Sequence, residues 1–255
     1  MPPFDDRLRT LRPLAPDARE RLRGIAAAED IRHTWASNAL EGNTLTLRET
    51  QRVIEDGATI AGKPLREHLE AVNHAAAVAR MHEIVHAGAA LNVHSMLQFH
   101  ALLMVRLDDA WAGRIRNADV GISGTAYRPP NARDASAGAD RAFALYAEAR
   151  EREHPALVAA DLHYRIARLH PFFDGNGRTA RLLMNAHLLQ RDFPPLIIEP
   201  DRRGEYLDAL DRGQETGDAT AFRRFVIDGV ERALDDYAQR LNIDRPPETD
   251  REGDT

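Results

Sequence analysis

The residues best suited to chemistry in this chain form one run of twelve, His170 to Arg181, which reads HPFFDGNGRTAR. Gly175 and Gly177 have no Cβ, so the backbone there can turn sharply and approach a ligand closely. The apolar-rich segment RTARLLMNAHLLQRD predicts a helix, which places the glycine turn at a helix N-terminus. Free N–H groups and the positive end of the helix dipole favour phosphate at such a turn. The run therefore predicts an anion site with His170 beside it.

The charge around this run also favours an anionic ligand. Arg178 and Arg181 are three residues apart, so they share one face of the expected helix. Residues 161–191 contain five arginines and two aspartates, whereas the whole 255-residue chain has a formal net charge of −6. A cationic island on an acidic protein favours a small polyanion over nucleic acid, which needs a broader basic face. The alternative interpretation is a helix-capping turn with surface arginines.

The run resembles the signature of the Fic family of nucleotide-dependent protein modifiers, HPFx(D/E)GNGRxxR. The matching residues are His170, Pro171, Phe172, Asp174, Gly175, Asn176, Gly177, Arg178 and Arg181. The resemblance implies transfer of AMP from ATP to a tyrosine, threonine or serine hydroxyl of a target protein, with pyrophosphate as the leaving group. The enzyme itself is a further possible acceptor.

The same resemblance implies a role for each residue of the signature. His170 would be the general base, for which a pKa near neutrality is suitable. Asp174 would hold Mg²⁺, which prefers carboxylate and phosphate oxygens. Asn176 would orient the phosphate under attack, and Phe172 would anchor the loop from below. The phosphate-binding set would be Gly175, Asn176, Gly177, Arg178 and Arg181, with the two arginines on the outer phosphates.

A second segment, SNALEGN at residues 37–43, resembles the inhibitory motif [S/T]xxxE(G/N) that some family members carry on an N-terminal helix. The resemblance implies that Glu41 pairs with Arg181 and prevents productive binding of the γ-phosphate. Ser37 lies one turn earlier on the same helical face. Gly42 and Asn43 suit a helix C-terminus. The alternative is an ordinary helix end whose glutamate faces solvent.

Other activities stay open at this point. A carboxylate such as Glu41 could position water and remove AMP, which would make the enzyme a deAMPylating hydrolase or bifunctional. A relative that uses another nucleotide donor is a further alternative, although the acid at Asp174 argues against a phosphorylating branch. A non-enzymatic regulator that only binds ATP is disfavoured by the intact His170.

The segment AGRIRNADVGISGTAYRPPNA interrupts an otherwise helical pattern. Short alternation followed by Pro129 and Pro130 predicts a small β-hairpin at about residues 117–131. The family resemblance implies that such a flap docks the target by main-chain pairing. The predicted docking residues are Gly121, Ile122, Ser123 and Gly124.

His82 to His86 reads HEIVH, which matches the HExxH pattern of zinc proteases. The extended pattern fails because Gly88 comes one position early and Asn92 replaces the third histidine. With 11 histidines in the chain, a chance match is the preferred interpretation.

Composition predicts a cytoplasmic protein with no membrane partner. The chain has no cysteine, which excludes disulfides and thiol catalysis, and residues 1–10 show no apolar core of a signal peptide. No run reaches the roughly 18 apolar residues of a membrane span. Lys63 is the single lysine among 34 basic residues, a bias typical of a GC-rich bacterial genome. A homodimer is a further possibility that the family resemblance suggests.

The positioning elements are expected to be helices, giving an all-α Fic fold: a helical bundle with the small hairpin flap. Thr46 and Glu49 predict a capping box at one helix start, and the apolar helix after the signature is expected to be central. The expected organisation is an N-terminal helical segment (1–29), a core (30–241) and a disordered tail (242–255). The core contains the inhibitory helix (about 30–43), the flap (117–131) and the signature loop (170–181). The expected helices are 19–38, 46–56, 65–87, 92–107, 138–152, 156–169, the segment after the loop, 203–213 and 219–241.

Overall fold

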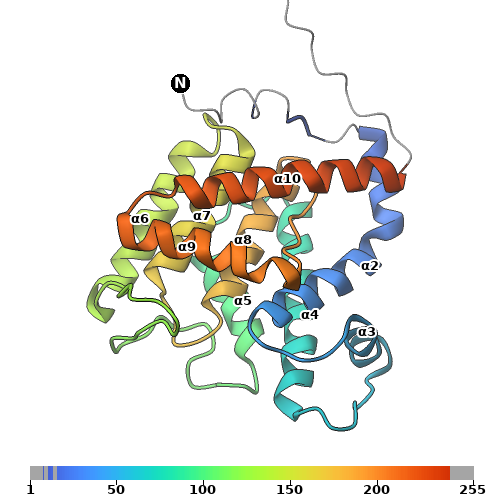
Figure 1. The fold of residues 1–255 in the computed structure, drawn as a ribbon, viewed down its shortest axis with the longest axis horizontal. Helices are drawn as coiled ribbons and strands as arrows, with labels where there is room; N and C mark the ends of the chain where they lie inside the picture. Colours follow the sequence, from blue (N-terminus) through green and yellow to red (C-terminus); the bar gives the residue numbers. More distant parts are fainter. Residues whose placement is uncertain (1–7, 9–10, 14–15, 242–255) are drawn as a thin grey trace, which may run out of the picture.

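The computed structural model describes residues 8, 11–13 and 16–241, with side chains in the first helix described from residue 26. Within these residues the chain is mainly helical and has no strand, so the predicted all-α fold is confirmed (Figure 1). Its helices are α2 (Pro16–Leu40), α3 (Leu47–Asp56), α4 (Leu65–His86), α5 (Val93–Met104), α6 (Ala132–Ala149), α7 (Pro155–Leu169), α8 (Asn176–Gln190), η1 (Pro200–Arg202), α9 (Arg203–Thr216) and α10 (Thr220–Leu241).

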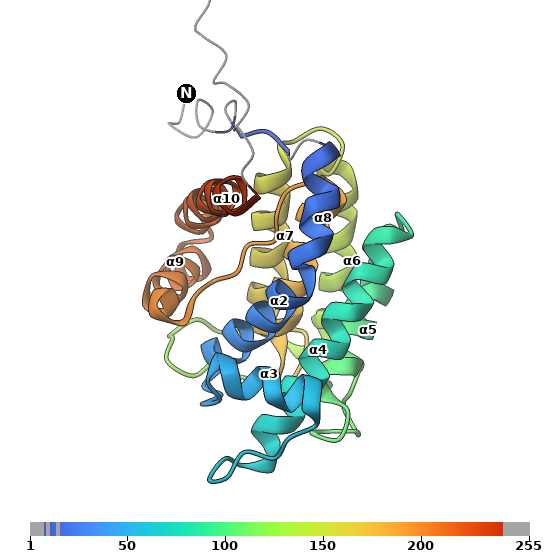
Figure 2. The same cartoon turned by 90° about the vertical axis from the view of Figure 1, so that its right-hand side faces the viewer.

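Helix α8 lies at the centre of the bundle, as its apolar sequence predicts. Figure 2 shows α9 and α10 on one side of α7 and α8, and α4, α5 and α6 on the other. Met184 and Leu188 of α8 belong to the apolar cluster with α9 and α10, whereas Leu182 and Leu183 belong to the cluster with α4, α5 and α6. All four side chains are fully buried. One helix therefore joins the two halves of the core and fixes the loop that precedes it.

Local sequence signals set the helix ends. The capping box at Thr46 is present: its hydroxyl accepts from the Glu49 N–H, and the Glu49 carboxylate accepts from the Thr46 N–H. Helix α7 begins at Pro155, where the missing N–H costs no helical hydrogen bond. Helix α2 ends at Leu40, and Gly42 follows in the left-handed region with φ of +96°. Glycine suits this position because a side chain there would be strained.

The segment 117–131 is not a β-hairpin. It contains bends and a turn, and none of its residues belongs to a strand. Its two ends are tied instead by the buried guanidinium of Arg116, which donates to the carbonyls of Ala118 and Pro130. An isolated two-stranded hairpin is marginally stable in water, and here a side chain replaces the ladder hydrogen bonds. We call this segment the 117–131 loop.

The predicted division of the chain is only partly visible. Helix α2 continues without a break across residues 29 and 30, where the N-terminal segment was expected to meet the core. The expected tail, residues 242–255, lies outside the described residues. Across the described residues, no helix is both long and apolar enough to cross a membrane.

Candidate functional site

The signature loop connects the C-terminus of α7 to the N-terminus of α8. His170 ends α7 in the left-handed region, with φ of +50° and ψ of +58°. A non-glycine residue there costs about 1–2 kcal/mol, and such strain concentrates at functional sites. Gly175, with φ of +74°, precedes the first turn of α8. The structure therefore places the glycine turn at a helix N-terminus, as the sequence predicts.

Buried contacts hold the loop from below. The Asn176 amide donates to the carbonyl of Phe172 at 2.9 Å and accepts from its N–H at 2.9 Å. Both polar atoms of Asn176 are thus used within the loop, and its predicted contact with phosphate stays a prediction. The Phe172 ring is fully buried and stacks on His100 of α5, with ring centroids 3.6 Å apart. Phe172 is therefore the anchor of the loop.

His100 also fixes the backbone beside Asp174. Its Nδ1 accepts from the N–H of Gly113 at 3.0 Å, so Nε2 carries the ring proton. Nε2 therefore donates a hydrogen bond to the carbonyl of Asp174 at 3.0 Å. Burial lowers the pKa of His100 to about 4, so the ring is neutral at physiological pH. No local pattern in the sequence around His100 indicates this contact, because α5 and the loop are distant in the chain.

The surroundings of His170 disfavour its protonated form. Burial lowers its pKa below the ordinary 6.5, a hydrogen bond to the backbone of Ala167 opposes this shift, and the Arg116 guanidinium adds to it. The ring is therefore mainly neutral at pH 7 and able to accept a proton. Arg116 also donates to the His170 carbonyl at 2.8 Å, which steadies the strained residue.

Asp174 is half-exposed and already held by cations. Its Oδ1 accepts from the Gly175 N–H at 2.6 Å and lies 3.3 Å from Arg178 Nη2. Its Oδ2 accepts from Arg66 of α4 at 2.7 Å. Burial alone would raise the pKa of Asp174, but Arg178, the Gly175 N–H and Arg66 outweigh it and lower the pKa.

The surroundings of Asp174 fit Mg²⁺ only in a site where substrate phosphate and water supply most of the ligands. Among the described residues, no group of three or more His, Asp or Glu side chains could hold a metal ion. Mg²⁺ often uses one or two carboxylates and completes its octahedron with water and substrate phosphate. An ionised, half-exposed Asp174 at a phosphate-binding turn suits that arrangement, in which Arg66 would release Oδ2.

Arg178 and Arg181 are both buried, with 2% of each residue exposed, yet their contacts differ. Within the described part of the chain, Nε and Nη1 of Arg178 have no hydrogen-bond partner. Glu70 Oε1 lies 3.8 Å from this Nη1, beyond hydrogen-bonding distance. Unpaired buried donors are costly, so these two nitrogens are an unusual feature of the buried Arg178 side chain.

Arg181, in contrast, is held from three directions. Its Nε donates to the Ser37 hydroxyl at 2.9 Å, and its Nη2 donates to the Ser37 carbonyl at 2.9 Å and to Glu41 at 2.7 Å. Nη1 donates to the Tyr206 hydroxyl at 3.2 Å. The Glu41 side chain is 39% exposed and that of Arg181 is 3% exposed. Burial opposes charge on both groups, but their mutual attraction lowers the pKa of Glu41 and raises that of Arg181.

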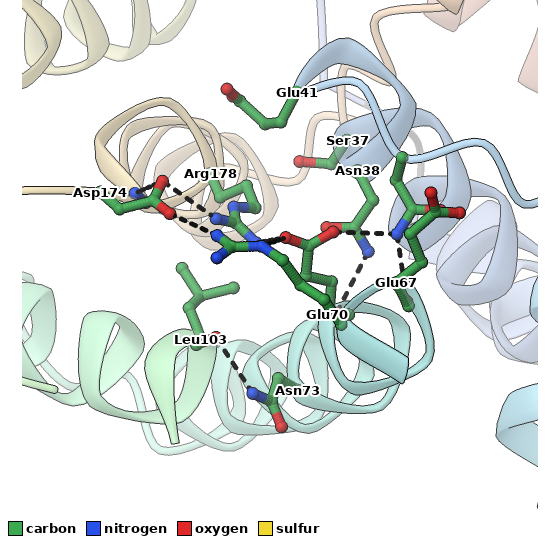
Figure 3. Close-up of polar contacts among 12 residues, drawn as sticks. Ser37, Asn38, Glu41, Glu67, Glu70, Asn73, Leu103, Asp174 and Arg178 are labelled. Atoms are coloured by element: carbon green, nitrogen blue, oxygen red, sulfur yellow. Dashed lines mark hydrogen bonds and ion pairs between the residues drawn. The ribbon is translucent and has the colours of Figure 1, made fainter. Parts of the chain in front are cut away.

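Gly177 allows Glu41 to reach this position. A Cβ on Gly177 would overlap the Glu41 carboxylate and crowd Arg181 Nη1. The end of α2 therefore closes over the first turn of α8, and Figure 3 shows Glu41 and Ser37 on the same side of Arg178, with the Glu41 carboxylate pointing away from Glu70. The pair between Glu41 and Arg181 is the one that the family resemblance implies, whereas the contacts of Ser37 with Arg181 were not predicted.

Gly42 and Asn43 connect the end of α2 to α4. Gly42 turns the chain, and the Asn43 amide donates to the Glu67 carbonyl at 3.0 Å and to Glu70 Oε2 at 3.0 Å. Glu70 Oε1 in turn accepts from Arg66 Nε at 3.0 Å. A chain of polar contacts thus runs from Asn43 through Glu70 and Arg66 to Asp174. The i,i+4 spacing of Arg66 and Glu70 predicts only a pair on the helix surface. The contacts that join this pair to Asn43 and Asp174 were therefore not predicted from the sequence.

The loop opens into a cavity of about 370 Å³. His170, Asp174, Gly175 and Gly177 line it on one side, with Glu41 at its wall. Three of the four predicted docking residues also line it, namely Gly121, Ile122 and Ser123, even though they form no hairpin. The opposite wall of the cavity comes from α9, whose residues were not predicted from the sequence to lie here. They are Arg203, Tyr206, Leu207, Leu210, Asp211 and Gln214.

The HExxH residues take part in other contacts. His82 Nε2 lies 2.8 Å from Asp30 of α2, and Glu83 accepts from Arg80 at 2.7 Å. Burial opposes charge on His82, but the hydrogen bond to Asp30 dominates and raises its pKa.

A partly buried histidine, a half-exposed carboxylate and a glycine turn at a helix N-terminus lie together on an all-helical fold. Residues 90–188 match the profile of the Fic/DOC family, which includes the whole signature loop. The chain therefore carries a Fic domain.

Related proteins agree with this placement. "Protein adenylyltransferase Fic" of Culex quinquefasciatus is 35% identical over 219 residues, which cover 84% of this chain and 43% of that protein. The protein of the same name from Nematostella vectensis is 34% identical over 84% of this chain and 50% of its own length. The solved structure of Fic-1 (residues 134–508) from Caenorhabditis elegans superposes with a TM-score of 0.80 at 28% identity, covering 94% of this chain and 70% of that one. The chain thus spans about half the length of these curated relatives, and their animal sources weigh against the bacterial origin predicted from arginine bias.

Proposed function

We propose that this chain is an autoinhibited protein adenylyltransferase that transfers AMP from ATP to a hydroxyl of a target protein. The observation that carries the proposal is the opening of His170, Asp174 and the Gly175–Gly177 turn into one cavity, with Glu41 at its wall. The names of the relatives support both the nucleotide and a protein acceptor. Tyrosine, threonine and serine are the candidate acceptors, on a separate target or on the enzyme itself.

The residues of the cavity suit a transfer step at the α-phosphate. The N–H groups at the start of α8 and the unpaired donors of Arg178 would bind the phosphate oxygens. The target hydroxyl oxygen would form a bond to the α-phosphorus, the bond to the bridging oxygen of pyrophosphate would break, and the hydroxyl proton would pass to His170. Because the protein does little covalent work, positioning and charge stabilisation supply most of the rate.

Mg²⁺ would be held by Asp174 together with phosphate oxygens, and it would neutralise phosphate charge when bound. Release of Arg66 from Oδ2 would free the second carboxylate oxygen. The nucleoside would lie toward α9, where Tyr206, Leu207 and Leu210 offer apolar surface and Gln214 offers an amide. The residues Gly121, Ile122 and Ser123 would face the target chain, because they line the same cavity as His170.

Glu41 would act as the inhibitor by occupying the Arg181 donor that a γ-phosphate needs. Ser37 and Tyr206 would keep Arg181 in place after Glu41 leaves, because they accept from its other N–H groups. The arginine would then be ready for the outer phosphate without rearrangement.

The test is label transfer from α-labelled ATP with Mg²⁺, in wild type, Glu41→Gly and Glu41→Gly/His170→Ala. Acceptors would come from a lysate and from the enzyme itself. We expect about tenfold or more label in Glu41→Gly than in wild type, equivalent to about 1.4 kcal/mol. The double variant should lose roughly a hundred- to ten-thousand-fold. Equal labelling in wild type and Glu41→Gly would refute inhibition, and full labelling without His170 would refute the mechanism.

Removal of AMP is a second candidate function, favoured by one observation. Glu41 is ionised, half-exposed and lines the same cavity as His170, so its carboxylate can position a water beside a bound AMP ester. In the same assay, pre-labelled acceptor would be incubated without ATP. Glu41→Gln should then lose release of AMP more than addition, and unchanged release would exclude this role.

A further inference from the structure

A second cavity, of about 480 Å³, lies between α6, α7 and the start of α10. Tyr127 and Pro130 of the 117–131 loop line it. Ala167 of α7 lines the His170 cavity, whereas the next two residues, Arg168 and Leu169, line the second cavity. The two cavities therefore flank the end of α7 and share the 117–131 loop as a wall. A protein with its hydroxyl at His170 would pass close to the second cavity.

The second cavity is cationic on a protein whose overall charge is negative. Its charged wall residues are Arg141, Arg165, Arg168, Arg223, Asp161 and Asp218. Arg223 and Asp161 neutralise each other through two hydrogen bonds of 2.7 Å. Arg168 lies over the ring of Tyr127 at 5.6 Å. Across the residues that the structure describes, neither Arg168 nor Arg141 has a carboxylate partner, so both are available to an acidic ligand.

A smaller cavity of about 190 Å³ continues from the larger one along α6 and α7, where Arg152 is accompanied by Glu148 and Glu153. It shares Leu145, Asp161 and Arg165 with the larger one. Leu145 is 43% exposed, so an apolar side chain lies open in the middle of the combined surface. We call this combined surface the arginine groove; Figure 1 shows α6 and α7 side by side, with the 117–131 loop at one end.

We propose that the arginine groove binds an acidic segment of the protein that is modified at His170. This proposal rests on the proposed function, because it assigns the segment to the acceptor. Charge complementarity favours carboxylates, and the exposed Leu145 favours a peptide that carries an apolar side chain. Nucleic acid is the less suitable occupant, because Asp161, Asp218, Glu148 and Glu153 interrupt the broad basic surface that it needs, whereas a short acidic segment can bind to Arg141 and Arg168 alone.

Peptide binding tests the groove without requiring catalysis. The probes are two fluorescein-labelled peptides with one threonine and one leucine, identical except for six glutamates in one and six glutamines in the other. Anisotropy is measured on wild type and on Arg141→Glu/Arg168→Glu. The control is Arg48→Glu/Arg52→Glu, which reverses two exposed arginines of α3. Circular dichroism and the milder Arg141→Gln/Arg168→Gln variant guard against misfolding.

We expect the glutamate peptide to bind wild type and the α3 control alike, and to bind the groove variant about tenfold or more weakly. Binding should weaken between 50 and 300 mM salt, because exposed charges are screened. Equal binding of both peptides, or equal binding to wild type and the groove variant, would overturn the proposal. Preferential binding of a twelve-nucleotide single-stranded RNA that depends on Arg141 and Arg168 would also overturn it.

Transfer to the same peptides separates this proposal from the proposed function. In the Glu41→Gly background, the groove variant should raise KM for the glutamate peptide and leave kcat within about twofold, because it removes binding without changing the reacting groups. Binding without transfer in any variant would refute the adenylyltransferase activity and leave the groove intact. Transfer with a KM that does not respond to the groove variant would refute the groove alone.

Discussion

At the scale of single residues, the two signature arginines differ in what they can still bind. Arg181 makes four hydrogen bonds, to Ser37, Glu41 and Tyr206, whereas Nε and Nη1 of Arg178 have no hydrogen-bond partner in the described structure. Glu41 is more than a third exposed, so solvent weakens its pair with Arg181. We place its contribution at about 1–3 kcal/mol, between a surface pair and a buried one. That range is consistent with the tenfold activation expected for Glu41→Gly.

The pKa of His170 predicts the pH dependence of transfer. Only the neutral ring can accept a proton, and burial lowers its pKa below 6.5. In Glu41→Gly, kcat/KM should therefore be constant from about pH 7 to 8 and should fall as pH decreases through that lowered pKa. Initial rates at constant ionic strength between pH 5 and 8 would measure this profile. A midpoint above 7 would contradict the assignment of His170 as a neutral base.

At the scale of elements, α4 restrains the loop between α7 and α8. Arg66 bridges Glu70 on its own helix and Asp174 in the loop. A guanidinium at Oδ2 competes with a metal cation for the same carboxylate oxygen. Sequence spacing gives no indication of this contact, since Arg66 and Asp174 are 108 residues apart.

Arg66→Ala should therefore strengthen metal binding. We expect the half-saturating Mn²⁺ concentration, followed by electron paramagnetic resonance with ATP present, to fall about two- to fivefold, because one competing exposed charge is removed. Arg48→Ala removes an exposed arginine of α3 and should leave metal binding unchanged. Weaker binding in Arg66→Ala would mean that Arg66 supports the metal site instead of competing with it.

At the scale of the whole molecule, the site depends on α8 because this helix belongs to both apolar clusters. Leu183 is fully buried, so Leu183→Ala should lower the free energy of unfolding by about 2–5 kcal/mol through lost burial and the cavity left behind. Leu145→Ala, at a side chain that is 43% exposed, should cost less than about 1 kcal/mol. Urea denaturation of both variants would measure the difference. Similar costs would show that α8 is not the helix on which the core depends.

The sequence predicts the helical elements well because apolar periodicity and capping residues act locally. The Thr46–Glu49 capping box and the buried character of α8 are both confirmed. The prediction of a hairpin at residues 117–131 is wrong, because the alternating pattern of residues does not reveal that the Arg116 side chain holds the two ends of the segment. Three hydrogen bonds from that one buried side chain hold Ala118, Pro130 and His170 together and take the place of strand pairing.

By itself, the sequence determined the family of the loop and the chemistry that we propose for it, because twelve consecutive residues carry the histidine, the acid, the turn and both arginines. It also determined which helix face carries Ser37 and Glu41, since four residues make about one turn. Only the tertiary structure decided that Glu41 reaches Arg181, that Arg66 reaches Asp174 and that α9 forms the far wall of the cavity. These contacts join residues that are distant in the chain, and packing around α8 brings them together.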